Sequence, residues 1–393
     1  MKLNCKIFIY KIVIILLMKK FVDNINNYVV DSLEGFRKAY DNIVNVNFSP
    51  NYVYRKHLNK EKVGLLSGGG SGHEPMHIGF VGYGMLDCAV PGDVFTSPTP
   101  DQIYEATKKI ISDNGVLYIV KNYSGDVMNF KMAAEMCYDE GLNIGFVVVD
   151  DDVGVINSTY TQGRRGTGLT VLLEKILGAA TETASSIDDN KNSVHMMFDN
   201  APTYAYNLEK AEKLANKVIS NGRSFGIALT SCTVPSVGKP TFQLNDTEIE
   251  IGVGIHGEPG RERINIKSSK ELAGIMVDNI LNDPDYTRKH PYYDKKEKKW
   301  KDIEIKSKKI KEGDDVIVFV NNLGSTPESE LYILYNDILH ILNEKDINVV
   351  TSLVGTYMTS LDMAGATLTL LRVDDEILDL WNSPVYTPSL VKF

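Results

Sequence analysis

Residues 63–75 read VGLLSGGGSGHEP, an apolar run that passes directly into a glycine-rich polar segment. The apolar run 63–66 is typical of a buried strand. Four of the five positions 68–72 are glycine, which permits backbone conformations with positive φ and a close approach to a ligand. Ligands of α/β proteins bind beyond the carboxyl ends of strands. The segment therefore predicts an α/β protein with a binding site after this strand.

Strand and helix patterns alternate along the rest of the chain. Apolar runs predict strands at 116–120, 144–149, 225–229, 249–255, 316–320, 349–354 and 367–371, and amphipathic runs predict helices at 101–111, 128–138, 168–180, 208–220 and 327–343. Such alternation favours the α/β class. For 393 residues we expect two α/β domains, 18–200 and 201–393, each with a central mixed sheet flanked by helices.

Composition excludes several functions. Hydrophobic residues make up 43% and charged residues 24%, which is ordinary for a globular protein. The net charge of −9 argues against a nucleic-acid-binding protein, because such domains are usually basic. The four cysteines form no C-x-x-C pair, so neither a disulfide framework nor structural zinc is expected. We expect a soluble cytoplasmic protein that handles a small neutral molecule.

Three segments depart from this ordinary pattern. Residues 1–17 carry three lysines in an apolar run shorter than the ~20 residues that span a bilayer, and no cleavage site follows. We expect a leader outside the native chain, or alternatively a membrane-associated leader. The polar stretch 181–202 predicts a surface insertion. Residues 288–311 hold eleven Lys and Arg against four Asp and Glu, which predicts a solvated loop or a docking patch for an acidic partner.

Three kinds of site compete for the glycine-rich segment. A Walker-type phosphate loop needs a lysine that the segment lacks, and the glycine spacing of a dinucleotide fingerprint is also missing. Residues 73–77 match the zinc motif H-E-x-x-H, but Pro75 would interrupt the helix on which both histidines must lie. The third kind is a small-molecule site in which backbone amides and His73 contact a neutral polar ligand.

Two further candidates also follow predicted strands. His256 stands in the glycine-rich run 252–260, where its ring is accessible. A neutral imidazole is a nucleophile as well as a base, although a lone histidine at a strand end is more often structural. Asp126 closes the polar turn 121–126. Its carboxylate is either a cap for the next helix or a proton acceptor for a substrate hydroxyl.

These motifs together resemble the dihydroxyacetone kinase K subunit. The resemblance rests on residues 65–77, 91–100, 121–126, 163–166, 232–235, 252–260, 320–324 and 359–363, and it extends in order from about Met18 to the C-terminus. Several ordered motifs are far more specific than any one of them.

The resemblance implies a role for each candidate residue. His256 attacks the substrate carbonyl carbon and forms a hemiaminal, which selects ketones and aldehydes over glycerol. Asp126 takes the proton from the hydroxyl to be phosphorylated, and His73 hydrogen-bonds the substrate and supports catalysis. The remaining substrate contacts match Gly70, Ser71, Gly72 and Lys121.

The resemblance also implies partners. The chain stops where the K region ends, so the phosphate is expected from a separate L subunit (DhaL), which holds ADP and Mg²⁺ and is rephosphorylated by an M subunit (DhaM) in phosphoenolpyruvate-dependent systems. No nucleotide or metal is expected in this chain, and family members are homodimers. The alternative is a catalytically silent paralogue that senses dihydroxyacetone as a transcriptional co-activator. Retention of Asp126 and His73 favours the enzyme.

Overall fold

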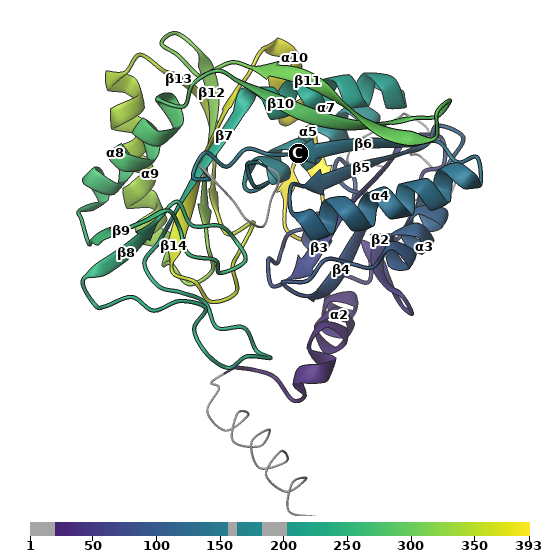
Figure 1. Cartoon of the computed structure of the whole chain (residues 1–393), viewed down its shortest axis with the longest axis horizontal. Coiled ribbons are helices and arrows are strands. Elements are labelled where there is room, and N and C mark those ends of the chain that lie inside the picture. Colours follow the sequence, from purple (N-terminus) through teal and green to yellow (C-terminus); the bar gives the residue numbers. More distant parts are fainter. Residues whose placement is uncertain (1–19, 156–162, 183–202) are drawn as a thin grey trace, which may run out of the picture.

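The computed structural model describes residues 20–155, 163–182 and 203–393 (Figure 1). The leader 1–17, most of the stretch 181–202 and the expected domain boundary at 200/201 lie outside these residues. Two six-stranded mixed sheets organise the described chain, which confirms the predicted α/β class with a helix-flanked mixed sheet in each half. Among the helices of the described residues, none is long and apolar enough to cross a membrane.

The first sheet has the strand order β1-β2-β4-β3-β5-β6. Its strands are β1 (Val44–Phe48), β2 (Asn51–Arg55), β3 (Gly64–Ser71), β4 (Cys88–Val94), β5 (Val116–Lys121) and β6 (Ile144–Val149). The four strands β4, β3, β5 and β6 run parallel. Leu65 and Leu66 of β3 enter the cores on opposite faces, because successive side chains of a strand alternate. Both faces of this sheet are therefore covered, as is usual for parallel strands.

Helices cover the first sheet on both sides. The outer face packs against α3 (Pro100–Ile110) and α4 (Ser124–Asp139), and the inner face against α5 (Leu169–Thr181) and α7 (Leu208–Asn221). Every residue of α5 is buried, which suits a helix that is apolar nearly all round. This helix contacts β3 and β5 of the first sheet and β7 of the second, so it lies between the two sheets.

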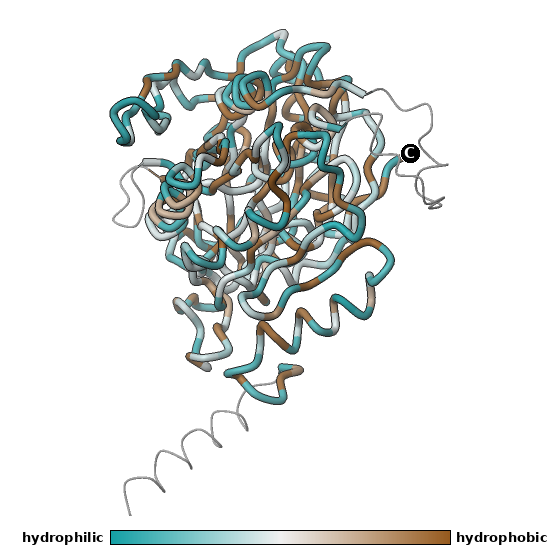
Figure 2. The backbone as a smooth tube through the Cα atoms, turned by 90° about the vertical axis from the view of Figure 1, so that its right-hand side faces the viewer, coloured by the Kyte–Doolittle hydropathy of each residue, from teal (hydrophilic) through white to brown (hydrophobic). Residues whose placement is uncertain are grey.

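The second sheet has the order β13-β12-β14-β7-β8-β9 (Figure 1). Its strands are β7 (Gly222–Ala228), β8 (Glu248–Ile251), β9 (Glu262–Asn265), β12 (Asp315–Asn322), β13 (Asn348–Gly355) and β14 (Gly365–Arg372). Helices α8 (Ser269–Leu281) and α9 (Glu328–Glu344) share a core with one face, while Phe319 and Leu371 of the other face join the core around α5. Figure 2 shows that the brown apolar stretches of the backbone are concentrated in the interior of the molecule, whereas teal hydrophilic stretches are more frequent at its periphery.

The ends of the described chain pack on the first half. Helix α2 (Tyr28–Ala39) contacts β1 and β4, and α10 (Asp375–Asn382) packs on α5. The last strands, β15 (Val385–Tyr386) and β16 (Val391–Lys392), pair with each other, and Tyr386 also bridges to Tyr83 of the first half. The C-terminal segment therefore returns from the second sheet and ties the two halves together.

The basic stretch 288–311 is mainly a hairpin and not the predicted loop, although most of its lysines are exposed to solvent as expected. Most of it forms β10 (Tyr286–Asp294) and β11 (Lys299–Ser307), which reach across to β6 and α7 (Figure 1). The Trp300 ring packs 4.9 Å from that of Phe146, and buried Arg288 pairs with Asp150 at 2.9 Å. Trp300 stands between two lysines and Arg288 is itself a basic residue, so the number of charges in the stretch does not reveal that these two side chains are anchors. The docking patch stays a prediction.

Three boundaries near the candidate residues differ from expectation. Glycines 68–70 belong to β3, because they pair in parallel with residues 90–92 of β4. Helix α4 begins at Ser124, so Asp126 lies in its first turn. Strand β8 ends at Ile251, four residues earlier than predicted, because Gly252 turns the backbone with a φ of 75°.

Candidate active site

The two predicted histidines meet, although they come from different sheets. His73 follows β3 of the first sheet, and His256 lies in the loop between β8 and β9 of the second. Their Nε2 atoms are 3.2 Å apart and their ring centroids 4.6 Å apart. A pair of imidazoles in hydrogen-bond contact shares one proton between two nitrogens when both rings are neutral.

The hydrogen bonds of His73 fix its tautomer. The ring is fully buried and stacks on Phe95, with centroids 5.1 Å apart. Its Nδ1 lies 2.8 Å from the carbonyl oxygen of Thr359, and because a carbonyl can only accept, Nδ1 carries the proton. Burial, followed by the neighbouring His256 and Lys121, holds the pKa of His73 well below its usual range. The neutral ring therefore offers Nε2 as an acceptor to His256.

His256 is held neutral and partly open. Burial, with smaller contributions from Lys121 and Arg165, lowers the pKa of His256 to about 3. The Tyr123 ring lies against it, with centroids 4.2 Å apart. Its Nδ1 is buried and has no hydrogen-bond partner among the described residues, although the residue as a whole is only half-buried. A neutral imidazole with a free nitrogen is a competent nucleophile.

A lysine and a carboxylate stand beside the glycine-rich strand. Lys121, the last residue of β5, is buried with its Nζ 3.0 Å from the Gly68 carbonyl oxygen and 3.5 Å from Asp126 Oδ2. Burial raises the pKa of Asp126, while Lys121 and a hydrogen bond from Ser97 oppose that rise. A carboxylate with a raised pKa is a better proton acceptor than an ordinary one. The arrangement suits a general base rather than a helix cap.

The predicted substrate-binding glycines have steric reasons to be glycine. A Cβ on Gly70 would lie 2.6 Å from the Thr96 nitrogen, and Gly72 has a φ of 101°. The Ser71 hydroxyl donates to the Gly92 carbonyl oxygen at 2.7 Å. The Gly72 amide already donates to a carboxylate oxygen of Glu74, at 2.9 Å. Substrate contacts at Ser71 and Gly72 therefore need either an exchange of these bonds or other backbone groups.

Arg165 organises the His256 loop, and sequence reasoning gave it no role. Its guanidinium lies 2.7 Å from Asp152 Oδ2 and 3.0 Å from Glu258 Oε1, and it donates to the Gly252 carbonyl oxygen at 2.8 Å. Glu258 in turn accepts the His256 backbone N–H at 2.8 Å. The loop is thus tied through one arginine to the end of β6. The sequence offered one signal for this role: the arginine pair 164–165 is flanked by glycines and follows the three aspartates 150–152 closely.

The zinc alternative does not fit this geometry. His77 contacts Glu174 through Nδ1 at 2.6 Å and Lys121 through Nε2 at 2.9 Å. His73 uses both of its ring nitrogens on different partners. Within the described ranges, no three His, Cys, Asp or Glu side chains are grouped to hold a metal ion.

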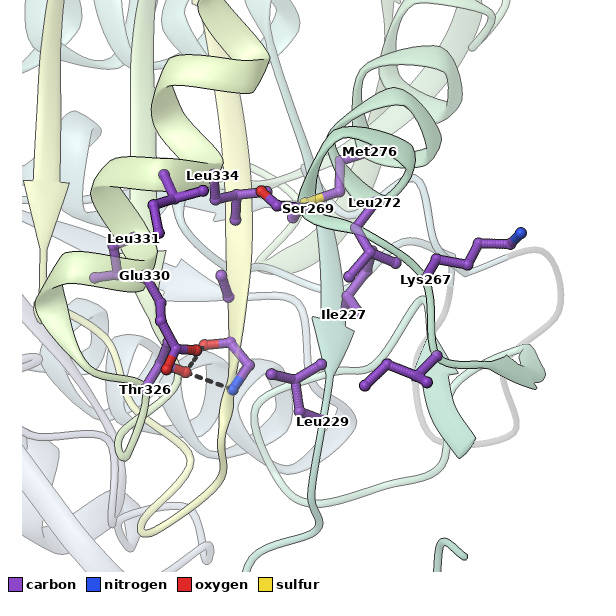
Figure 3. A pocket seen from close by; sticks show the side chains of 14 residues that line it. Ile227, Leu229, Lys267, Ser269, Leu272, Met276, Thr326, Glu330, Leu331 and Leu334 are labelled. Carbon is purple, nitrogen blue, oxygen red and sulfur yellow. Dashed lines mark hydrogen bonds between the residues drawn. The ribbon is translucent and has the colours of Figure 1, made fainter. Parts of the chain in front are cut away.

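A separate cavity of about 230 Å³ lies between α8, α9 and the second sheet (Figure 3). Its walls are mainly apolar, with Ile227, Leu229, Leu272, Met276, Leu331 and Leu334 among them. The Thr326 hydroxyl at its edge is bonded to the backbone of Gly365. None of the predicted site residues lines this cavity, so it is distinct from the histidine pair.

Comparisons with known proteins place the chain in a family. A model of the Dak1 domain matches residues 34–212 and 193–389. The chain is 43% identical to the Escherichia coli (strain K12) "PEP-dependent dihydroxyacetone kinase, dihydroxyacetone-binding subunit DhaK", over 95% of this chain and 99% of that protein. It is 42% identical to the corresponding PTS-dependent subunit of Lactococcus lactis, over 91% of this chain and 94% of the relative.

Solved structures give the same fold. The "dihydroxyacetone kinase operon co-activator Dha-DhaQ" superimposes with a TM-score of 0.75 at 30% identity, covering 92% of this chain and 98% of the other. The dihydroxyacetone kinase of C. freundii has a TM-score of 0.75 at 29% identity, covering 95% of this chain and 60% of that kinase. The expected family and phosphotransferase class are confirmed: the chain belongs to the Dak1 family of dihydroxyacetone kinase subunits.

Proposed function

We propose that this chain binds dihydroxyacetone covalently through His256 and presents it for phosphorylation. A lone pair of the ring attacks the carbonyl carbon, and the π electrons of the C=O bond move to the oxygen. The oxygen takes up a proton and the ring loses its own N–H proton, so the adduct is a neutral hemiaminal. Glycerol has no carbonyl carbon and cannot form this bond.

The observation that carries the proposal is the state of His256. Its pKa of about 3 keeps the ring unprotonated at neutral pH, and one ring nitrogen has no partner among the described residues. A protonated imidazole has no lone pair for the attack. His73 lies close enough to pass or accept a proton, or to hydrogen-bond the adduct oxygen.

Asp126 supplies the base for phosphoryl transfer in this proposal. It accepts the proton of the substrate hydroxyl, while Lys121 compensates the negative charge. Phosphoryl transfer depends on positioning and charge stabilisation more than on covalent work by the protein. Covalent capture on His256 provides such positioning, because it removes the freedom of the ketone before the donor arrives. Further substrate contacts are assigned to the segment Gly70, Ser71 and Gly72.

The phosphoryl donor is assigned to a separate L subunit that carries ADP and Mg²⁺, recharged by an M subunit. Support comes from the E. coli relative, which is named as PEP-dependent and as the dihydroxyacetone-binding subunit. A C. freundii kinase solved with AMP-PNP and Mg²⁺ is covered by this chain over only 61% of its length. A cytoplasmic location and a homodimeric state complete the proposal.

A dihydroxyacetone-sensing co-activator is the second candidate. It is favoured by the structural likeness to the operon co-activator, at 30% identity and with almost complete coverage. A sensor needs only the ketone site, whereas a kinase subunit also needs the base. Turnover with a charged L subunit separates the two functions.

The deciding experiment follows the substrate carbonyl directly. Dihydroxyacetone labelled with carbon-13 at the carbonyl is added to the full chain and observed by NMR. A hemiaminal moves the resonance from the ketone region to that of a saturated carbon. His256→Ala should abolish the shifted signal, whereas His340→Ala, on the exposed face of α9, should keep it. A shifted signal that survives in folded His256→Ala would refute the proposal.

A further inference from the structure

A chain of buried polar groups connects Asp126 to helix α5. Lys121 Nζ contacts Asp126 at 3.5 Å on one side and His77 Nε2 at 2.9 Å on the other. The other ring nitrogen, Nδ1 of His77, lies 2.6 Å from Glu174 Oε1 and, at the longer distance of 3.1 Å, from the Ser67 hydroxyl. All of these side chains are buried, and Glu174 comes from the helix α5 between the two sheets.

The direction of each hydrogen bond in this chain is fixed by chemistry. An ammonium group can only donate, so His77 Nε2 must accept from Lys121. The ring proton therefore sits on Nδ1 and is donated to Glu174. Burial, followed by Lys121, holds the pKa of His77 well below its usual range, which keeps the ring neutral and Nε2 free to accept.

The contacts of Lys121 leave it little freedom. Its Nζ has two hydrogen-bond acceptors, the Gly68 carbonyl oxygen at 3.0 Å and His77 Nε2 at 2.9 Å, and it forms an ion pair with the Asp126 carboxylate at 3.5 Å. A Cβ on Gly69 would lie 2.2 Å from Nζ and 3.4 Å from Asp126 Oδ2, so the glycine-rich strand leaves room for this ammonium. If His77 cannot accept, one donor of the buried ammonium loses its partner and the group has to move.

A purely structural explanation of Glu174 is a poor fit. A carboxyl group in a completely buried helix carries a desolvation cost, and its Oε2 has no hydrogen-bond partner among the described residues. Burial raises the pKa of Glu174 to about 8. Apart from the buried Lys175 beside it, the neighbouring residues of α5 are apolar, so an apolar residue would pack at this position at lower cost.

We propose that His77 and Glu174 are positioning residues: Glu174 fixes the His77 tautomer, and His77 holds the Lys121 ammonium beside Asp126. Neither residue contacts the ketone. The inference rests on the proposed function, because it assigns Asp126 as the base that Lys121 serves. The other groups that face Asp126 are the Ser97 hydroxyl and Tyr123, neither of which replaces the positive charge.

The test compares two substitutions of His77 in the full chain. His77→Gln keeps an acceptor for Lys121 and a donor for Glu174, whereas His77→Leu removes both. We expect His77→Leu to retain the carbon-13 adduct, because His256 is intact, but to lose roughly tenfold to a hundredfold in turnover with a charged L subunit. Its acid limb of turnover should move to higher pH, because a displaced ammonium no longer lowers the pKa of Asp126. His77→Gln should recover most of the turnover and the wild-type acid limb.

The outcomes are distinguishable. An unshifted acid limb in folded His77→Leu, or equal losses in His77→Gln and His77→Leu, would overturn the positioning role. If His77→Leu does not fold, Glu174→Leu and Glu174→Gln give the same comparison, since only glutamine can accept from Nδ1. No adduct and no turnover in the wild-type chain would instead refute the proposed function, independently of His77.

Discussion

Lowering the pH tests whether the environment of His256 makes it a nucleophile over an unusually wide range. An exposed histidine has a pKa near 6.5, whereas burial lowers the pKa of His256 to about 3. The attacking ring must be neutral. We therefore expect the affinity of this chain for dihydroxyacetone to stay nearly constant from pH 8 down to pH 5.

The size of the difference follows from the two pKa values. At pH 5 a histidine of ordinary pKa is only about 3% neutral, so its ketone affinity would fall roughly thirtyfold between pH 8 and pH 5. With a pKa of about 3, about 99% of His256 is still neutral at pH 5. The dissociation constant should then change by less than about twofold.

Calorimetric titration of the full chain at several pH values measures this directly, without a phosphoryl donor. Circular dichroism at each pH confirms that the protein is folded, and glycerol serves as the ligand that cannot react. Asp126→Asn removes the carboxyl group whose pKa is raised, so a pH effect that disappears in this variant belongs to Asp126. A thirtyfold loss of affinity centred near pH 6.5, present in both proteins, would refute the assigned state of His256.

Three further variants probe separate parts of the site. Arg165→Met leaves the buried Asp152 carboxylate unpaired and should lower the free energy of unfolding by ~3–5 kcal/mol, which denaturant titration measures; a loss below about 1 kcal/mol would contradict the anchoring role. Asp126→Asn should keep the carbon-13 adduct and lose turnover with a charged L subunit, and normal turnover would exclude Asp126 as the base. Gly72→Ala imposes a side chain on a φ of 101° and should cost about 1 kcal/mol of stability and weaken ketone binding; an unchanged melting temperature and affinity would show that the strand relaxes.

Much of the architecture was predictable because local patterns carried it. The beginning of β3 and nearly the whole of β5 were expected where they lie, since both are apolar runs, whereas the glycines 68–70 proved to continue β3. The hairpin at 286–307 was missed because its aromatic anchors are interspersed with lysines. Its Trp300 finds its partner Phe146 only in the folded chain, about 150 residues away along the sequence.

The site was only partly predictable for the same reason. Neighbouring glycines marked His73 and His256 as candidates, but no feature of the sequence predicts that these two histidines, 183 residues apart, are in contact. His77 was considered only as the second histidine of the H-E-x-x-H match, and no role was predicted for its partner Glu174 in the mainly apolar helix α5. An acidic residue beside Lys175 in an otherwise apolar run was the signal available for Glu174, because a charged residue is rarely buried without a partner.

The division of the site between two sheets has a chemical consequence. The proposed nucleophile His256 belongs to a loop of the second sheet, whereas the proposed base Asp126 and its lysine belong to the first. A ketone held on His256 can lose its hydroxyl proton to Asp126 only if the two sheets keep a fixed separation. Helix α5 lies between the sheets and makes contacts with strands of both, so the packing that stabilises the fold also sets this separation. Because Glu174 projects from the same helix, the element that spaces the sheets is also linked to the proposed base, by the hydrogen bonds of His77 with Glu174 and Lys121 and by the ion pair between Lys121 and Asp126.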